Sequence, residues 1–359
     1  MLKLIHGADF HLDSPFSGLT PEQAALRREE QRELLADLAR LAREKGADLV
    51  LLSGDLLDGR RVYRETAQAL AAALAAIPCP VFIAPGNHDY CSPQSVYATL
   101  DWPENVHIFR SPQVAGVSLP ELNCTVWGAA FCAPHREDSP LSGFRAEGEG
   151  LHLMCLHGDL SPQSSYGPIR REEAEASGLD YLALGHVHQS GFWKAGKTVL
   201  AYPGCPQGRG FDETGAKGVL YVEVEPGRVV PRFLPLARRR YEEVSVPLTN
   251  SANYLTTILA ALPEHTAADV YRIRLTGEAP APNLPALEQA LAPRFFGLTL
   301  RDETRLPRDL WARREEDTLT GLFLQAMWER CQADPDDQTC QLAARFGLAA
   351  LENGEEAAL

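Results

Sequence analysis

The residues with the clearest chemical meaning in this chain are Asp, His and Asn side chains that directly follow short apolar runs. The clusters are Asp9-Phe10-His11, Gly54-Asp55, Gly86-Asn87-His88-Asp89, His157-Gly158-Asp159 and Gly185-His186-Val187-His188. Imidazole, carboxylate and amide donors without a thiolate suit divalent metal ions. Two such ions, held roughly 3.5–4 Å apart, can generate a hydroxide that attacks phosphorus in line. The clusters therefore predict a two-metal site that cleaves a phosphoester.

The order and spacing of these side chains predict which of them share a metal ion. Asp9 and His11 are two residues apart on one turn, so both can face the same ion. We expect them to bind the first metal together with His188. Asp55 is the expected bridge, because one short carboxylate can contact both ions. The ligands expected at the second metal are Asn87, His157 and His186. This mixed set favours Mn²⁺ over a structural zinc ion, with Fe²⁺ and Mg²⁺ as alternatives.

His88 directly follows a predicted ligand and is the candidate catalytic group. It can lean over the metals without binding them, where it could stabilise the pentacoordinate phosphorus or protonate the leaving oxygen. Asp89 is expected to act with it by orienting its ring. For any one cluster, scattered turn residues are the simpler interpretation. Because several such clusters occur in one chain, each at the end of an apolar run, a metal site is favoured over chance.

Buried strands alternating with helices are the elements expected to position these side chains. The apolar runs lie at residues 2–5, 48–52, 80–83, 151–155 and 181–184, and each ends in a cluster. Residues 21–45 have helical periodicity and residues 64–77 are alanine-rich, so helices alternate with the first three runs. This order predicts βαβ units. A further strand without a ligand is expected over residues 123–131.

The pattern changes after His188. Short β-branched runs at residues 198–202, 218–224 and 229–236 are separated by Gly and Pro, which predicts an antiparallel meander and thus a second sheet. Strands over 270–275 and 298–300, with a helix over 284–291, predict a small α/β domain. The predicted domains are a catalytic domain at 1–245, a small capping and DNA-binding domain at 246–310, and a helical segment at 311–359.

One apolar stripe is expected on the helix that begins near residue 317. It comprises Leu319, Leu322, Phe323 and Met327. The simpler interpretation is the inner face of a helix that packs on its own domain. Docking of a partner's coiled coil is the second interpretation.

Charge and cysteine content limit the possible partners and compartment. The net charge of −14 in 359 residues argues against a generally basic nucleic-acid surface. Arg60, Arg61 and Arg209 are nevertheless on loops that could face the metals, and we predict that they bind substrate. The eight cysteines form no Cys-x-x-Cys pair and are expected to be reduced thiols. No apolar run is long enough for a signal peptide core or a membrane span, so a cytoplasmic protein without a membrane partner is expected.

Five ordered motifs in this sequence resemble those of the calcineurin-like metallophosphoesterases. They are Asp9-x-His11, Gly54-Asp55-x-x-Asp58, Gly86-Asn87-His88-Asp89, His157 and Gly185-His186-x-His188, and the resemblance covers roughly residues 1–240. It implies an α/β (α+β) fold, a two-sheet αββα sandwich flanked by helices with a dimetal site at its edge. A small C-terminal α/β capping domain and a helical tail would follow.

The opening His6-Gly-Ala-Asp-Phe-His-Leu-Asp-Ser-Pro and the stretch Tyr202-Pro-Gly-Cys-Pro-Gln-Gly-Arg-Gly are similar to the SbcD and YhaO type of DNA repair exonuclease. This resemblance implies a Mn²⁺-dependent nuclease that acts on DNA, with an SbcC-like or YhaN-like coiled-coil ATPase as partner. A homodimer is left open. Some relatives carry a histidine near the substrate where this chain has Asp58. An acid there could hold a ligand in place but would not bind phosphate directly, so endonuclease activity is not implied.

Two further hypotheses follow from the same residues. One is a phosphoesterase for a small nucleotide diester or a pyrophosphate, and the other is a non-catalytic scaffold on a retained fold. The complete ligand set argues against the scaffold. The residues beyond the catalytic domain favour DNA, because a small-molecule enzyme needs no second capping domain.

Overall fold

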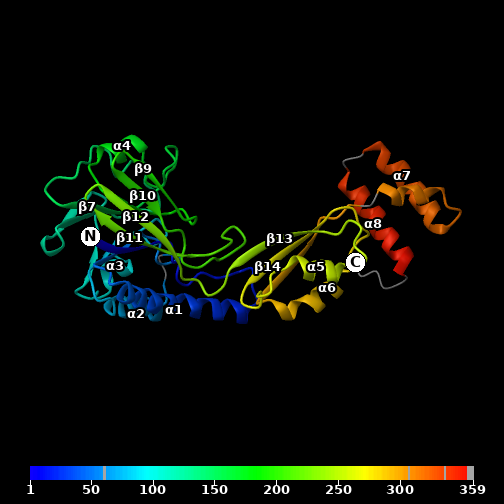
Figure 1. The fold of residues 1–359 in the computed structure, drawn as a ribbon, viewed down its shortest axis with the longest axis horizontal. Coiled ribbons are helices and arrows are strands. Elements are labelled where there is room, and N and C mark those ends of the chain that lie inside the picture. Colours follow the sequence, from blue (N-terminus) through cyan, green and yellow to red (C-terminus); the bar gives the residue numbers. More distant parts are fainter. Residues whose placement is uncertain (60–61, 306–307, 335–336, 354–359) are drawn as a thin grey trace. The chain divides into compact units, whose positions relative to one another are not determined.

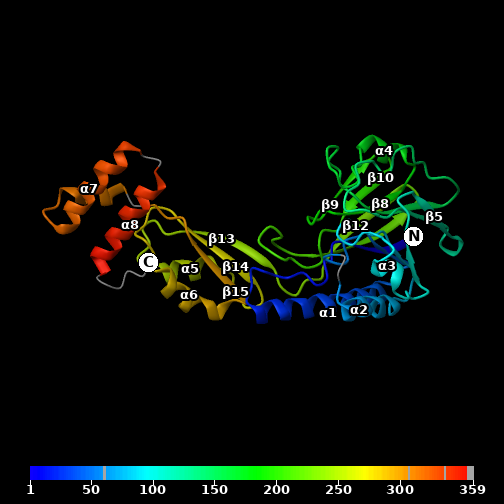
Figure 2. The same cartoon turned by 180° about the vertical axis from the view of Figure 1, so that it is seen from behind.

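The computed structural model describes residues 1–59, 62–305, 308–334 and 337–353. Contacts within the chain divide it into two compact units, Met1–Arg240 and Tyr241–Leu359. Figures 1 and 2 show the two units from opposite sides. Among the described residues, no helix is both long enough and apolar enough to cross a membrane. The predicted division at residues 245 and 310 stays a prediction.

The first sheet of unit 1 is built on the predicted ligand-bearing strands. Its order is β12 (Arg228–Pro235), β11 (Gly218–Glu225), β1 (Leu2–Gly7), β2 (Leu49–Leu52), β3 (Val81–Ile83) and β4 (Val106–Ile108). Strands β1 to β4 are parallel, and β11 pairs antiparallel with β1. The carboxyl ends of β1, β2 and β3 therefore lie at the same edge of this sheet.

The second sheet carries the remaining predicted ligands. Its order is β5 (Ala115–Leu119), β6 (Cys124–Gly128), β7 (Leu151–His157), β8 (Tyr181–Gly185), β10 (Thr198–Tyr202) and β9 (Gly191–Ala195). Strands β6, β7, β8 and β10 are parallel, whereas the edge strands β5 and β9 are antiparallel to their neighbours. The sheet thus brings the carboxyl ends of β7 and β8 together.

The predicted antiparallel meander after His188 is right for its last two strands and wrong for its first. Strand β10 lies in the second sheet and is parallel to β8, whereas β11 and β12 form a hairpin that joins the first sheet beside β1. A β-branched run between turns marks a strand but does not choose its partner. Here the long connection between β10 and β11 carries the chain from one sheet to the other.

Four layers make up unit 1, in the αββα order that the resemblance implied. Helices α1 (Pro21–Lys45) and α2 (Arg64–Ala75) pack on the outer face of the first sheet, and α4 (Arg171–Ala176) packs on that of the second. Figure 1 shows α1 and α2 on one side of the sheets and α4 on the other. The inner faces meet in a core that includes Leu51, Phe82, Leu153 and Ala183. The shorter helices are α3 (Val96–Thr99) and η1 (Pro120–Leu122).

Both ends of helix α1 are defined by local sequence. The Thr20 hydroxyl accepts a hydrogen bond from the Gln23 amide and the Gln23 side chain accepts one from the Thr20 amide, a capping box with Pro21 at the first helical position. Gly46 ends the helix in the left-handed conformation, at φ 58°. These signals fix a long helix, which supports two loops of the site.

A three-stranded parallel sheet forms the centre of unit 2. Its order is β13 (Tyr241–Pro247), β14 (Val270–Thr276) and β15 (Gly297–Asp302). Helices α5 (Tyr254–Ala261) and α6 (Leu284–Leu291), followed by η2 (Ala292–Arg294), make the crossovers that parallel strands require. Their apolar faces share one core with the sheet, including Ile258, Ile273 and Leu291.

The helix that begins at Leu319 buries only part of the expected stripe: Met327 is buried and Phe323 half-buried, whereas Leu319 and Leu322 are exposed. After η3 (Arg308–Glu315) come α7 (Leu319–Ala333) and α8 (Gln338–Asn353), and the buried residues of α7 are Gly321, Leu324 and Met327. Leu319 and Leu322, predicted on the inner stripe, are 70% and 67% exposed. The physical reason is a close approach at Gly321, where a Cβ would collide with the Glu316 carbonyl.

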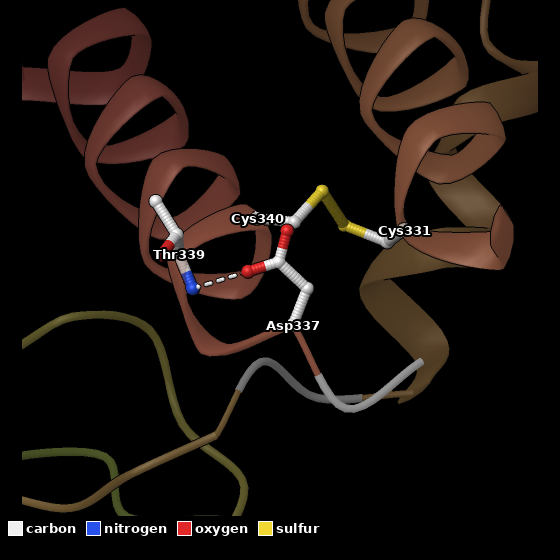
Figure 3. Close-up of a disulfide and its surroundings, with 4 residues drawn as sticks. All are labelled: Cys331, Asp337, Thr339 and Cys340. Atoms are coloured by element: carbon white, nitrogen blue, oxygen red, sulfur yellow. Dashed lines mark hydrogen bonds between the residues drawn. A yellow bond between two sulfur atoms is a disulfide. The ribbon is translucent and has the colours of Figure 1, made fainter. Parts of the chain in front are cut away.

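The expectation that all cysteines are reduced is wrong for one pair. Cys331 on α7 and Cys340 on α8 form a disulfide that joins the two helices, as Figure 3 shows. The free thiols are Cys79, Cys91, Cys124, Cys132, Cys155 and Cys205, and all but Cys132 are buried. The two cysteines are 9 residues apart, so no short motif reveals the pair: the packing of α7 against α8 brings the sulfur atoms together.

Candidate metal centre

The predicted ligands meet where the carboxyl ends of strands from both sheets come together. Asp9 follows β1, Asp55 follows β2, and His186 follows β8. Asp9, Asp55, His186 and His11 have positive φ angles of 55°, 49°, 107° and 45°. Non-glycine residues adopt this conformation at a cost, and such strain gathers at functional sites. The backbone is therefore bent sharply at the places where ligands would face inward.

Asp9, His11 and His188 form the first cluster, with one donor atom from each within 4.8 Å of the others. The Nε2 atoms of His11 and His188 lie 3.2 Å apart. His188 Nε2 is also 3.8 Å from Asp9 Oδ1. These are the three residues that the spacing predicted for the first metal.

Carboxylates behind the two imidazoles determine which nitrogen faces the cluster. His11 Nδ1 lies 3.0 Å from Asp58 Oδ1, and His188 Nδ1 lies 2.6 Å from Glu213 Oε1. A carboxylate only accepts, so each Nδ1 carries the proton and each Nε2 presents a lone pair. Burial, with the nearby Arg209 charge, lowers the pKa of His11 well below its usual value and keeps the ring neutral.

Two lone pairs that face each other at this separation repel unless a proton or a metal ion lies between them. The first cluster therefore fits a divalent metal ion by the chemistry of its donors. The Cys205 thiol is close by, but burial raises its pKa, and it donates to the backbone carbonyl of His188. Without a metal ion beside it, the thiol is therefore protonated.

Asp9, Asp55 and His157 form the second cluster, again with donor atoms within 4.8 Å. His157 Nε2 lies 3.4 Å from Asp55 Oδ2 and 2.9 Å from Asn87 Oδ1. Its Nδ1 lies 2.9 Å from the Ser53 carbonyl, which leaves the lone pair on Nε2. Burial lowers the pKa of His157 to about 4. The second cluster therefore offers a neutral imidazole, an amide oxygen and carboxylates.

A single oxygen of Asp55 reaches toward both clusters. Oδ2 lies 3.4 Å from His157 Nε2 and 3.9 Å from His11 Nε2. Oδ1 accepts a hydrogen bond from the His88 amide at 2.9 Å, which fixes the carboxylate plane. Burial raises the pKa of Asp55, and burial together with Asp55 raises the pKa of Asp9 well above its usual range. Cations would relieve this crowding of buried carboxyl groups.

His186 lies beside the second cluster. Its ring centroid is 5.3 Å from that of His157, and its Nε2 is 3.8 Å from Asp159 Oδ2. Its backbone amide donates to both carboxylate oxygens of Asp9. Burial lowers the pKa of His186 to about 4. Asp159, for which the sequence predicted no separate role, thus joins this side of the site.

His88 stands on the solvent side of the first cluster. Its side chain is exposed, its ring centroid lies 4.8 Å from that of His11, and its Nδ1 is 3.4 Å from the Asp58 carbonyl. None of the residues in the two clusters is as exposed. The ring is therefore open to a substrate that approaches the clusters.

Asp89 differs from its expected place beside the His88 ring. Its carboxylate is buried and accepts five hydrogen bonds, whose donors are the amides of Asp55, Leu56, Leu57 and Gly86 and the hydroxyl of Tyr97. The Tyr97 bond is 2.6 Å long. Four backbone amides compete more effectively for these oxygens than one exposed ring. Asp89 thus ties the Asp55 loop to the Asn87 loop.

The predicted substrate ligands have different positions. Arg60 and Arg61 lie outside the described residues. Arg209 reaches the first cluster, but its guanidinium pairs with Asp58 and Glu213. Glu213 and the carbonyl of Ser53 were not predicted as members of the site. An acid four residues after Arg209 gives no motif, so only their proximity in space reveals the connection.

Comparisons with known proteins identify the family of this chain. Residues 2–190 match the family model of the calcineurin-like phosphoesterases. The chain is 29% identical to the uncharacterized metallophosphoesterase YhaO of Bacillus subtilis, over 88% of this chain and 81% of that protein. It is 22% identical to the SbcD component of the nuclease SbcCD of the same organism, over 63% of this chain and 67% of that one. Among solved structures, TT1561 of Thermus thermophilus matches 65% of this chain and 98% of its own, with 12% identity and a TM-score of 0.41.

Proposed function

Because this chain belongs to the calcineurin-like phosphoesterases, we propose that it cleaves phosphodiester bonds of DNA as a Mn²⁺-dependent exonuclease in DNA repair. One observation carries the phosphodiesterase part of the proposal. Asp55 Oδ2 lies within 4 Å of an imidazole nitrogen in each cluster, 3.4 Å from His157 and 3.9 Å from His11. This arrangement supports two neighbouring divalent ions with one shared carboxylate.

Each group of residues has its own task in this mechanism. Divalent ions held by the two clusters would supply Lewis-acid stabilisation of the phosphoryl oxygens and would lower the pKa of water. The His88 amide holds Asp55 Oδ1 and so keeps Oδ2 turned toward both clusters. The exposed His88 ring is the group that can protonate the leaving oxygen. Asp89 keeps the two loops that carry Asp55 and Asn87 in register.

Two observations support DNA as the substrate. The relative that is named as a component of the nuclease SbcCD aligns over 63% of this chain. Unit 2, Tyr241–Leu359, lies beyond the family match and would contact a large substrate or a partner. We extend the proposal to an SbcC-like or YhaN-like coiled-coil ATPase as that partner. The exposed apolar side chains that support a docking surface on α7 and α8 are Leu319, Leu322, Leu342, Phe346 and Leu351.

A small phosphodiester or pyrophosphate is the second candidate substrate, because many basic side chains are already paired. Arg238 contacts Glu33 and Asp37, and Arg239 contacts Glu30 at 2.7 Å. A chain with net charge −14 repels a polyanion, and these pairs reduce its local positive surface further. This candidate needs no extended DNA surface.

A substrate panel with Mn²⁺ distinguishes the two candidates. The purified chain is assayed on end-labelled linear DNA, covalently closed DNA, a nucleotide diester, pyrophosphate and an aryl phosphodiester, with Asp55→Asn as the inactive control. Shortening of linear DNA from its ends supports the exonuclease. Rapid turnover of the nucleotide diester, with every form of DNA intact even after ATP and the copurified partner are added, contradicts it.

A further inference from the structure

We propose that Arg209 is a positioning residue for the first metal cluster: its guanidinium holds Asp58 and Glu213, and these hold the imidazoles of His11 and His188. The inference rests on the metal centre of the proposed function but not on the identity of the substrate. It also gives Arg209 a task other than the predicted binding of substrate. The structure supports it through contacts on both sides of the guanidinium.

The two carboxylates meet the arginine and the imidazoles through the same oxygen atoms. Arg209 Nη1 donates to Asp58 Oδ1 at 3.1 Å, and His11 Nδ1 lies 3.0 Å from that oxygen. Arg209 Nη2 donates to Glu213 Oε1 at 2.9 Å, and His188 Nδ1 lies 2.6 Å from that oxygen. One planar group thus sets the positions of two imidazoles that come from different sheets.

Glu213 is held more completely than Asp58. Its Oε2 accepts a hydrogen bond from the Arg209 backbone amide at 2.7 Å, and Arg209 Nε lies within 3.5 Å of both carboxylate oxygens. The Glu213 side chain is 4% exposed and that of Arg209 is 21% exposed. A buried carboxylate with these contacts has little freedom to rotate, so the direction of its bond to His188 is fixed.

Helix α1 anchors the segment from which Arg209 extends. Arg27, fully buried, donates from Nη2 to the Gly208 carbonyl at 2.9 Å, and Gln207 donates to the Arg27 carbonyl at 3.2 Å. One turn further along the helix, Gln31 donates to the carbonyls of Phe10 and His11. The same helix therefore supports the Arg209 loop and the His11 loop.

The chemistry of the contact requires arginine rather than lysine. The guanidinium is planar and carries five N–H donors in a fixed fork, so it can bind two carboxylates at a set angle. A lysine ammonium is a point charge on a flexible stem and would leave one carboxylate free to turn. Loss of partners that orient metal ligands typically lowers metal affinity by about 10- to 100-fold.

The test measures Mn²⁺ binding directly, by electron paramagnetic resonance of free Mn²⁺ and by calorimetry on the whole metal-free chain. Arg209→Lys and Arg209→Gln should each weaken one of two binding events by about 10- to 100-fold, with a smaller change in the other. Glu213→Gln should have a similar effect. The double variant with Arg209→Gln should lose less Mn²⁺ binding free energy than the sum of the two single losses. Arg232→Gln is the matched control, because Arg232 forms an ordinary pair with Glu223 at 2.9 Å on the first sheet.

Substrate kinetics at saturating Mn²⁺ separate positioning from substrate binding. A positioning role predicts that Arg209→Lys restores turnover at high Mn²⁺ with KM close to that of the parent chain. Unchanged Mn²⁺ affinity with a raised KM would overturn the inference and assign Arg209 to the substrate. Unchanged affinity in both Glu213→Gln and Arg209→Lys, in chains that fold normally by circular dichroism, would also overturn it. If the parent chain binds no Mn²⁺ at all, the metal centre itself fails, and that result is distinct from both.

Discussion

His11 Nε2 and His188 Nε2 lie 3.2 Å apart although the two residues are separated by 177 positions in the sequence. Each ring donates a hydrogen bond from Nδ1–H to a carboxylate oxygen, so the two facing Nε2 atoms carry lone pairs. Such an arrangement is unfavourable in a metal-free protein and favourable around a cation. The folded state should therefore depend on divalent ions both for its activity and for its stability.

Removal of divalent ions should abolish activity and lower the melting temperature. A ligand that binds only the folded state stabilises it by about 2.7 kcal/mol when present at 100 times its Kd. Relief of repulsion between Asp9 and Asp55, whose pKa values are raised by burial, is one source of this affinity. Differential scanning calorimetry with EDTA, and again with excess Mn²⁺, measures the shift. Equal melting temperatures in the two samples would contradict the metal centre.

Asp55→Asn should reduce turnover of every substrate by about two orders of magnitude or more, because a neutral amide cannot bridge two cations. Mn²⁺ affinity should fall with it. Asp101→Asn, at an exposed position, is the matched control and should behave like the parent chain. Turnover of DNA or an aryl phosphodiester at the parent rate in the Asp55 variant would rule out its bridging role.

His88→Ala should reduce DNA cleavage by about 100- to 10,000-fold, the usual range for loss of a general acid. Mn²⁺ binding should stay near the parent value, because His88 lies outside the two clusters. The loss should be much smaller for an aryl phosphodiester, whose leaving group needs little protonation. His265→Ala, an exposed histidine of unit 2, serves as control. An equal loss on both substrates would instead point to stabilisation of the phosphorus.

Acid should destabilise the metal-free protein through His6, a buried residue whose Nδ1 lies 2.8 Å from the Tyr181 hydroxyl. Burial lowers the pKa of His6 to about 3 in the folded state, against an ordinary value of 6.5. Between these values the unfolded chain binds the additional proton, so stability falls as pH decreases from 6.5 toward 3. One such proton contributes a slope of about 1.4 kcal/mol per pH unit at most.

Urea unfolding in EDTA at pH 5, 6 and 7 measures that slope. His6→Gln should lower the free energy of unfolding at neutral pH. The slope of that free energy against pH should also decrease, by less than the contribution of one full proton. The difference in slope is informative even where the variant is less stable overall. Identical slopes in the two chains would show that another group binds the proton.

Reduction of the Cys331–Cys340 disulfide should loosen α7 and α8. For a sequence separation of 9, the entropy of the unfolded chain gives a stabilisation of about 2–3 kcal/mol. Hydrogen exchange of peptides from the two helices should therefore quicken in a reducing buffer, whereas peptides from β1 and β2 should not change. Cys132→Ser, which removes an exposed free thiol, is the control. Peptide mapping without reductant that recovers both cysteines as free thiols would contradict the disulfide.

Local patterns predicted the strands and the main helices well, because alternation, capping residues and turn residues act over a few positions. The apolar runs that lead to Asp9, Asp55 and His157 overlap strands β1, β2 and β7. The meander was wrong for its first strand because a β-branched run carries no information about its partner strand. The stripe on α7 was right at Met327 and wrong at Leu319 and Leu322, because a close contact at Gly321, not the apolar pattern alone, sets which face is buried.

The sequence by itself determined which donors this protein can offer, since the residue types and their order at strand ends predict a metal-assisted phosphoesterase. Only the tertiary structure decided how each donor is held. Asp89 binds backbone amides rather than the His88 ring, and Glu213 and Arg209 stand behind His188. The physical reason is that these contacts depend on strand register and helix packing, which join residues far apart in the chain.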